Sequence, residues 1–193
     1  MRRIPIAIGL TLLLGAGLAT PTFAAQPLVR EHYSWSDSID AEICGVMLHG
    51  EAHGSGVFML KSGRAGDPTP YFFDNYRWEI VWTSPDDPTV GFIESGNGMW
   101  RDQRITLIEG TVYHFEIHEV GNPYQILTLD GRQVLRDIGR ITWEFDVDTH
   151  GDEDLSNDEF LWGPDPTSLA GPHPLLTISD EEWCETVLGL LDS

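Results

Sequence analysis

Residues 112–118 read VYHFEIH, and residues 141–147 read ITWEFDV. In both stretches apolar and polar side chains alternate, and a period of two predicts a β-strand with one buried and one solvated face. The same period dominates the chain from Asp40 to Val147. These stretches therefore indicate a fold built mainly from β-strands.

Turn residues divide this region into short runs. Gly96-Asn97-Gly98 marks one turn or bulge, and Asp130-Gly131 is typical of a tight hairpin. About eight or nine strands result, one of them predicted over residues 42–48. Because most connections are short, neighbouring strands should be antiparallel, which predicts an up-and-down barrel or, as the alternative, a β-sandwich.

The pattern changes after Val147. Residues 148–177 are acidic and then rich in proline, which predicts a long loop. Residues 179–191 are the one predicted helix, because Ser179 and Glu182 have the spacing of a capping box and apolar residues recur on one face. We therefore expect an all-β domain with a C-terminal helix that docks on the sheet.

The N-terminal residues have the features of a secretory signal. A pair of arginines precedes an uncharged, largely apolar run over residues 4–18, and small residues precede a cleavage point after Ala24. The run is about 15 residues long, whereas a membrane-spanning helix needs about 20. We expect residues 1–24 to be removed and residues 25–193 to form a single secreted domain without a membrane span.

The chain has two cysteines, Cys44 and Cys184. An even number of cysteines in an exported protein predicts a disulfide bond. This bond would join the first strand to the last helix.

The chain is strongly acidic, with a net charge of −20. Such a charge repels phosphate backbones and anionic lipid head groups, so nucleic acid is excluded as a partner. It also predicts a monomer in dilute solution.

Short turn and cysteine motifs recur along residues 35–190. They are Cys44-Gly45, Gly96-Asn97-Gly98, Glu109-Gly110-Thr111, Asp130-Gly131, Asp158-Glu159-Phe160 and Cys184. In these motifs the chain resembles small secreted proteins that are common in actinobacteria and whose function is unknown. The resemblance implies a secreted β fold with a terminal disulfide, and it implies no activity or catalytic residues. The layout of a barrel followed by a helix is also similar to that of lipocalins, although the Gly-x-Trp motif expected early in that family is absent.

An acidic segment after the last strand suggests a calcium site. Its oxygen ligands recur at alternate positions, and Gly151 occupies the sixth position, where a calcium loop turns sharply. His150 at the fifth position and Asn157 at the twelfth depart from that pattern. The alternative is a solvated acidic loop. The candidate ligands are Asp146, Asp148, Asp152, Asp154 and Asp158.

A second candidate is the run His114-x-Glu116-x-His118, whose side chains share one face of a strand. Two of them could hold a transition metal if another strand supplied a third ligand. The outer two lie about 13 Å apart along a strand, too far to share an ion. The alternative is a solvated face.

Aromatic residues are the third feature. Several fall on apolar strand faces, where they either pack in the core or line a ligand cavity. The cavity candidates are Trp78, Trp82, Tyr113, Phe115 and Trp143.

Three functions are compatible with these features. The first is a secreted, non-catalytic β protein that binds a small apolar ligand or an envelope component. The second is an extracellular metal-assisted enzyme, and the third is a calcium-stabilised structural or envelope protein. The sequence favours the first, because it contains no nucleophile elbow and no phosphate-binding glycine loop.

Overall fold

The computed structural model describes residues 27–62, 70–151 and 157–192. The predicted signal segment, residues 1–24, lies outside them.

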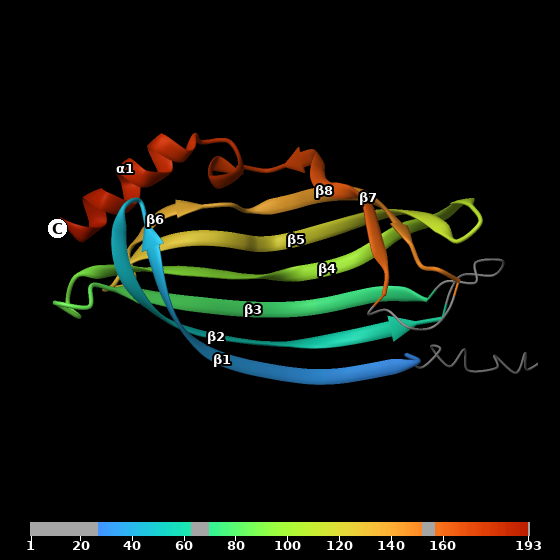
Figure 1. The fold of residues 1–193 in the computed structure, drawn as a ribbon, viewed down its shortest axis with the longest axis horizontal. Helices are drawn as coiled ribbons and strands as arrows, with labels where there is room; N and C mark the ends of the chain where they lie inside the picture. Colours follow the sequence, from blue (N-terminus) through green and yellow to red (C-terminus); the bar gives the residue numbers. More distant parts are fainter. Residues whose placement is uncertain (1–26, 63–69, 152–156, 193) are drawn as a thin grey trace, which may run out of the picture.

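Eight antiparallel strands form one sheet (Figure 1). They are β1 (Val29–Ile43), β2 (Val46–Lys61), β3 (Tyr71–Thr83), β4 (Gly91–Glu109), β5 (Val112–Thr128), β6 (Gln133–Arg136), β7 (Gly139–Asp148) and β8 (Glu159–Ala170). The order is β1-β2-β3-β4-β5-β7-β8, and the short β6 also pairs with β5. The prediction of an antiparallel all-β fold with one C-terminal helix is confirmed. Among the described residues the pairing ends at β1 on one side and β8 on the other, so these edges do not close the sheet into a barrel.

Strand β8 corrects part of the predicted loop over residues 148–177. Glu159–Ala170 pairs with β7, and the pairing contains three register shifts. An edge strand needs hydrogen bonds on one side only, and bulges also tolerate proline, which has no N–H to donate. The loop prediction is therefore wrong for this segment.

The prediction of a single strand over residues 42–48 is also wrong. Cys44 and Gly45 form the turn between β1 and β2, with φ values of 53° and 81°. Positive φ at both central residues is the geometry of a tight hairpin whose twist matches the flanking strands. The cysteine is therefore at the tip of a hairpin.

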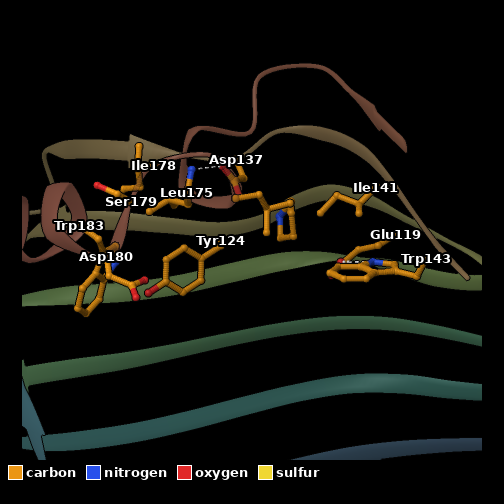
Figure 2. A pocket seen from close by; sticks show the side chains of 12 residues that line it. Glu119, Tyr124, Asp137, Ile141, Trp143, Leu175, Ile178, Ser179, Asp180 and Trp183 are labelled. Carbon is orange, nitrogen blue, oxygen red and sulfur yellow. Dashed lines mark hydrogen bonds between the residues drawn. The ribbon is translucent and has the colours of Figure 1, made fainter. Parts of the chain in front are cut away.

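The C-terminal segment packs on one end of one face of the sheet, which we call the inner face. A short 3-10 helix, η1 (Pro174–Leu176), leads into α1 (Asp180–Leu191), which begins with the predicted capping box of Ser179 and Glu182. Figure 2 shows Leu175 and Trp183 from this segment beside Tyr124 of the sheet. The core under α1 consists of Leu48, Trp82, Phe92, Ile126, Val187 and Leu190.

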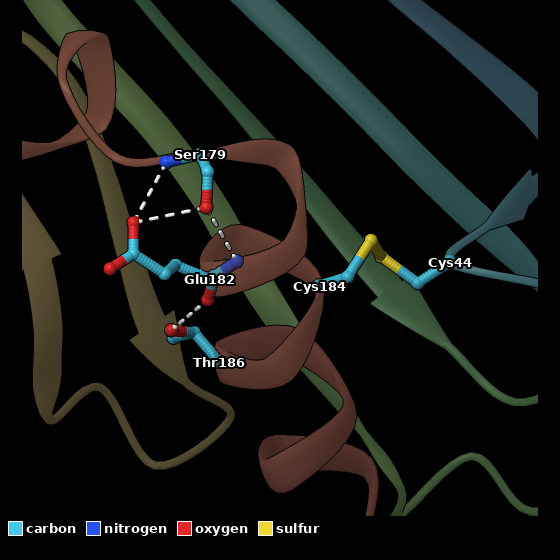
Figure 3. The surroundings of a disulfide bond; sticks show 5 residues. All are labelled: Cys44, Ser179, Glu182, Cys184 and Thr186. Carbon is cyan, nitrogen blue, oxygen red and sulfur yellow. Dashed lines mark hydrogen bonds between the residues drawn. A yellow bond between two sulfur atoms is a disulfide. The ribbon is translucent and has the colours of Figure 1, made fainter.

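The two cysteines form a disulfide bond between the β1–β2 hairpin and α1 (Figure 3). Their sequence separation is 140 residues. The predicted pairing of Cys44 with Cys184 is confirmed. Helix α1 packs on the core near the central strand β4, and the hairpin joins the two strands at the β1 edge of the sheet. The bond therefore fastens the helix to that edge.

Aromatic residues on the inner face lie directly opposite glycines of the neighbouring strand. Trp35 and Trp78 flank Gly54, while Tyr33 and Tyr76 flank Gly56. A Cβ atom at Gly54 would lie 2.5 Å from the Trp35 ring, so the ring occupies the space that a larger residue would fill. The rings therefore lie over the strands and form a flat layer.

Gly96 on β4 shows how strictly this layer limits residue size. We expect Gly96→Ala to lower the free energy of unfolding by about 2 kcal/mol, because overpacking costs about 1–3 kcal/mol. The added Cβ would lie 2.1 Å from the backbone oxygen of Pro123 and 2.6 Å from Nε1 of Trp78. Urea denaturation at neutral pH measures the change.

The matched control is Gly189→Ala in α1, where a Cβ would meet no atom within 4 Å. Alanine is a better helix former than glycine, so the free energy of unfolding of this variant should rise by about 0.5–1 kcal/mol. Equal effects of the two substitutions would contradict the packing argument.

Candidate functional site

The site candidate is a hollow on the inner face, which we call the aromatic groove. It has a volume of about 370 Å³. Its lining comprises Tyr33, Trp35, Phe72, Asp74, Tyr76, Arg77, Trp78, Trp100, Glu119 and Pro123. The rings come from β1, β3 and β4, because the sheet register places their aromatic positions side by side. Trp35 at the edge strand is 45% exposed, so its ring surface is open to a ligand.

Glu119 on β5 lies at the centre of a hydrogen-bond network in this groove. Its side chain is 5% exposed. The indole nitrogens of Trp100 and Trp143 donate to it at 2.6 and 3.0 Å, and the hydroxyl of Tyr76 donates to the same carboxylate. Trp100 and Trp143 also stack, with ring centroids 5.9 Å apart and planes 10° from parallel. One carboxylate therefore holds three aromatic side chains in defined positions.

Asp74 on β3 is the second carboxylate of the groove. It lies opposite Trp100, which in turn lies opposite Glu119, so the three side chains form a row across three strands. The Tyr33 hydroxyl donates to Oδ2 of Asp74 at 2.8 Å. Oδ1 of Asp74 is buried and has no hydrogen-bond partner among the described residues. Hydrogen bonds within the described residues therefore compensate the charge of Asp74 only in part.

The tyrosines that donate to these carboxylates remain protonated over the physiological range. Burial, followed by the hydrogen bond to Asp74, raises the pKa of Tyr33 to about 12. Burial and the charge of Glu119 raise the pKa of Tyr76 further above its usual value. Both phenols are therefore fixed as donors toward the carboxylates.

A second hollow, the helix-side pocket, adjoins the groove. It has a volume of about 460 Å³ and shares Glu119 and Pro123 with the groove. Figure 2 shows its walls, with Tyr124 and Trp143 on the sheet and Trp183 on α1. The groove thus continues beneath the C-terminal segment.

Glu94 on β4 repeats this arrangement next to the helix-side pocket. Its carboxylate is 8% exposed and accepts hydrogen bonds from Nε1 of Trp82 at 2.9 Å and from the Tyr124 hydroxyl. Tyr124 also contacts the Trp78 ring, at 5.6 Å between centroids. The aromatic layer is therefore tied to carboxylates at two places.

Asp102 on β4 is a buried carboxyl next to Phe72, one of the residues that line the groove. It is 9% exposed and accepts the backbone N–H of Phe72 at 2.6 Å. Burial raises the pKa of Asp102 from 3.8 to about 6, and the Phe72 hydrogen bond opposes this shift only in part. The ionised form is therefore disfavoured in the folded protein.

We expect Asp102→Asn to stabilise the protein in a pH-dependent way. Because the folded-state pKa is the higher one, protonation favours the folded state, and this advantage is lost as the pH rises from about 4 to about 6. The variant stays neutral, so its free energy of unfolding should be close to that of the wild type near pH 4. Above pH 6.5 it should exceed the wild-type value by about 3 kcal/mol, since one pKa unit corresponds to about 1.4 kcal/mol. Urea unfolding as a function of pH measures the gap, and a gap independent of pH would contradict the burial of an ionisable carboxyl.

Charge is distributed unequally between the two faces. By register and hydrogen bonding, each lysine or arginine of the described strands falls on the outer face, opposite α1. These residues are Arg30, Lys61, Arg77, Arg101, Arg104, Arg136 and Arg140. Arg77 contributes to the groove lining, but its Nε donates to Ser55 of the outer face at 2.8 Å. The inner face carries Asp74, Glu94, Asp102 and Glu119.

The structure separates the five aromatic cavity candidates. Trp78 lines the aromatic groove and Trp143 the helix-side pocket. Trp82 packs in the core under α1. Tyr113 and Phe115 lie on the inner face farther from α1, where Phe115 stacks on Phe145 at 5.5 Å.

The residues of the predicted transition-metal site lie on the outer face and have other partners. His114 bonds to Asp146 through Nδ1 at 2.7 Å, while Nε2 of His118 lies 3.5 Å from Glu116. Glu116 is also 3.7 Å from Arg104. Burial is the main cause that lowers the pKa of His118. In the described part of the chain, no group of three or more His, Cys, Asp or Glu side chains is arranged to hold a metal ion.

The calcium candidates are only partly described. Asp146 bonds to His114, and Asp148 accepts the Thr111 hydroxyl at 2.5 Å and the His150 N–H at 2.9 Å. Asp158 makes interactions of its own. Asp152 and Asp154 lie outside the described residues, so the calcium site stays a prediction.

Sequence reasoning missed the carboxylates of the inner face, although a signal exists. Glu119 continues the apolar phase of Tyr113, Phe115 and Ile117 on β5. Asp74 similarly falls in phase with Phe72 and Tyr76. An acidic residue in the buried phase of a strand must find donors, and the tryptophans and tyrosines of neighbouring strands are the available ones.

Comparisons with known proteins identify no relative: no protein family, curated protein or solved structure matches the chain. None of the described helices is long and apolar enough to cross a membrane. The protein is thus defined by its fold and its site. It is a β-meander with a groove whose aromatic side chains donate hydrogen bonds to two of its own carboxylates.

Proposed function

We propose that the protein is an exported, non-catalytic binding protein that holds a small, largely apolar ligand in the aromatic groove. The observation that carries this proposal is the layer of partly exposed rings, which lies over glycines and is tied to Asp74 and Glu119. Aromatic surfaces in a concave site provide large contact areas with few rotatable bonds. The disulfide supports export.

The size of the site supports a small ligand. Ligand pockets commonly measure about 300–1,000 Å³, and the groove and the helix-side pocket measure about 370 and 460 Å³. The two hollows meet at Glu119 and Pro123. An elongated ligand could therefore extend from the open edge at Trp35 toward α1.

Rigidity of the site also favours binding. Tyr76, Trp100 and Trp143 are each held by Glu119, so little side-chain freedom is left to lose when a ligand arrives. Fixing a rotamer-rich side chain on binding costs about 0.5–1.5 kcal/mol of binding free energy. Because the network orders these side chains during folding, ligand binding does not have to order them.

The test uses N-phenyl-1-naphthylamine, an uncharged apolar dye whose fluorescence rises in apolar sites. We expect saturable binding that weakens about five- to twenty-fold in Trp35→Ala, since an aromatic contact contributes about 0.5–1.5 kcal/mol beyond its buried area. Phe160→Ala is the control, because Phe160 is 61% exposed and lies outside both hollows. Absence of saturable binding, or equal weakening in both variants, would overturn the proposal.

A further inference from the structure

We propose that the ligand of the aromatic groove is an organic cation, an alkyl- or arylammonium group seated on the rings of Tyr76 and Trp100 beside Asp74. This inference rests on the proposed binding function and names the chemical class of its ligand.

The first support is the charge on the two faces. The groove contains Asp74 and Glu119, whereas the one lysine and the arginines of the described strands lie on the outer face. The one basic residue in the lining, Arg77, is bound to Ser55 of that face. The low dielectric of a half-buried hollow strengthens the field of these carboxylates, so a cation is attracted and an anion is repelled.

The second support is the imbalance of hydrogen-bonding groups. The donors of Tyr33, Tyr76, Trp100 and Trp143 already point at Asp74 or Glu119. The indole nitrogens of Trp35 and Trp78 lie against the strands, 2.6 Å from where Cβ atoms at Gly54 and Gly96 would be. Oδ1 of Asp74, in contrast, is a buried acceptor without a hydrogen-bond partner among the described residues. The charge of this carboxylate is therefore only partly compensated, which favours a ligand that carries positive charge over a ligand that only accepts hydrogen bonds.

The third support is the nature of the ring surfaces. The faces of tryptophan and tyrosine are negative and attract cations within about 6 Å of the ring centre, with a gain of about 2 kcal/mol or more where water is excluded. A phenol or indole that donates to a carboxylate is polarised, because hydrogen bonds in a chain strengthen one another. Tyr76 and Trp100 both donate to Glu119. Their faces are therefore more electron-rich than those of isolated rings.

A neutral sugar is the main competing ligand, because sugars also stack on aromatic rings. Each sugar hydroxyl is both a donor and an acceptor, so a sugar site needs free protein donors as well as acceptors. In the groove, the donors of Tyr33, Tyr76 and Trp100 are directed at Asp74 or Glu119. The indole nitrogens of Trp35 and Trp78 lie against the strands. The observations therefore favour the cation, and sugars enter the test as competitors.

The test compares acetylcholine with 3,3-dimethylbutyl acetate, which has the same shape but no charge. Both are titrated against the dye bound to the full protein. We expect the cation to displace the dye at a concentration at least ten times lower than the isostere does, and we expect acetate and glucose to displace it no better than the isostere.

Asp74→Asn should reduce the tenfold preference to threefold or less. Asp86→Asn is the matched control, since it removes the same charge in the exposed turn between β3 and β4 and should keep the preference. Tyr33→Phe offers a second variant that leaves the Asp74 carboxylate in place, and the preference should persist or increase in it.

Equal displacement by acetylcholine and its isostere would overturn the proposal that the ligand is a cation, and the proposed binding function would stand. Stronger displacement by glucose would do the same. If the dye itself fails to bind, both proposals fall together.

Discussion

Replacing Cys44 and Cys184 together by serine is expected to lower the free energy of unfolding by about 3–5 kcal/mol. The disulfide closes a segment of 140 residues, so it removes much of the conformational entropy of the unfolded chain. For a loop of this length the chain-entropy estimate is about 5 kcal/mol, and measured values are commonly lower. The variant should still fold, because Val187 and Leu190 remain buried against the sheet.

Two measurements separate the disulfide from the helix itself. Urea unfolding under non-reducing conditions gives the global loss, and amide hydrogen exchange in α1 shows whether the helix opens first. Ser179→Ala serves as the control, because it removes the hydrogen bonds of the N-cap hydroxyl with Glu182 and should lower the free energy of unfolding by about 1 kcal/mol. A double serine variant no less stable than Ser179→Ala would show that α1 is held by packing alone.

Replacing Glu119 by alanine is expected to lower the free energy of unfolding by about 3–5 kcal/mol. The substitution leaves the donors of Tyr76, Trp100 and Trp143 in a buried site without their acceptor. Each buried group without a partner costs about 1–3 kcal/mol, and water entering the space relieves part of that sum. Tryptophan emission should also shift to the red, since Trp100 and Trp143 lose the carboxylate that positions them.

The control for this substitution is Glu79→Ala on the outer face of β3, where the side chain is 40% exposed and 3.9 Å from His53. An exposed pair of this kind contributes about 0–1 kcal/mol. Glu119→Gln keeps one acceptor oxygen and should fall between the two, so it tests the network if the alanine variant does not fold. A loss in Glu119→Ala no larger than in Glu79→Ala would contradict the role assigned to the network.

Stability and binding should be coupled at this residue. Glu119 positions Trp100 and Trp143 and lies where the two hollows meet. Loss of the carboxylate frees these rings, so a ligand would have to order them again. The groove therefore depends on the same hydrogen bonds as the fold around it.

Local sequence patterns were sufficient for the strands of the central region and for α1. The alternation in residues 141–147 corresponds to β7, and the capping box at Ser179 begins the helix as predicted. Both features involve residues close in the chain, so their physics is local. Strand β8 was missed for the complementary reason: its pairing depends on the edge of β7 and not on its own proline-rich sequence.

The candidate site was harder to predict. Among the aromatic candidates, Trp78 and Trp143 line the two hollows, whereas Trp82 belongs to the core under α1. All three lie at apolar, inner-face positions of the alternating strand pattern, so the alternation alone does not distinguish them. Their roles differ because α1 covers one end of the inner face and leaves the rest open.

By itself, the sequence determined the β-rich class, the C-terminal helix and the pairing of the only two cysteines. Tertiary structure decided that Trp35 lies on Gly54, that Glu119 meets three donors, and that the arginines and lysine of the strands face away from the groove. The physical reason is that side-chain alternation depends on residues that are neighbours in the chain. The register between strands depends on contacts between residues far apart in the chain, which form only in the folded sheet.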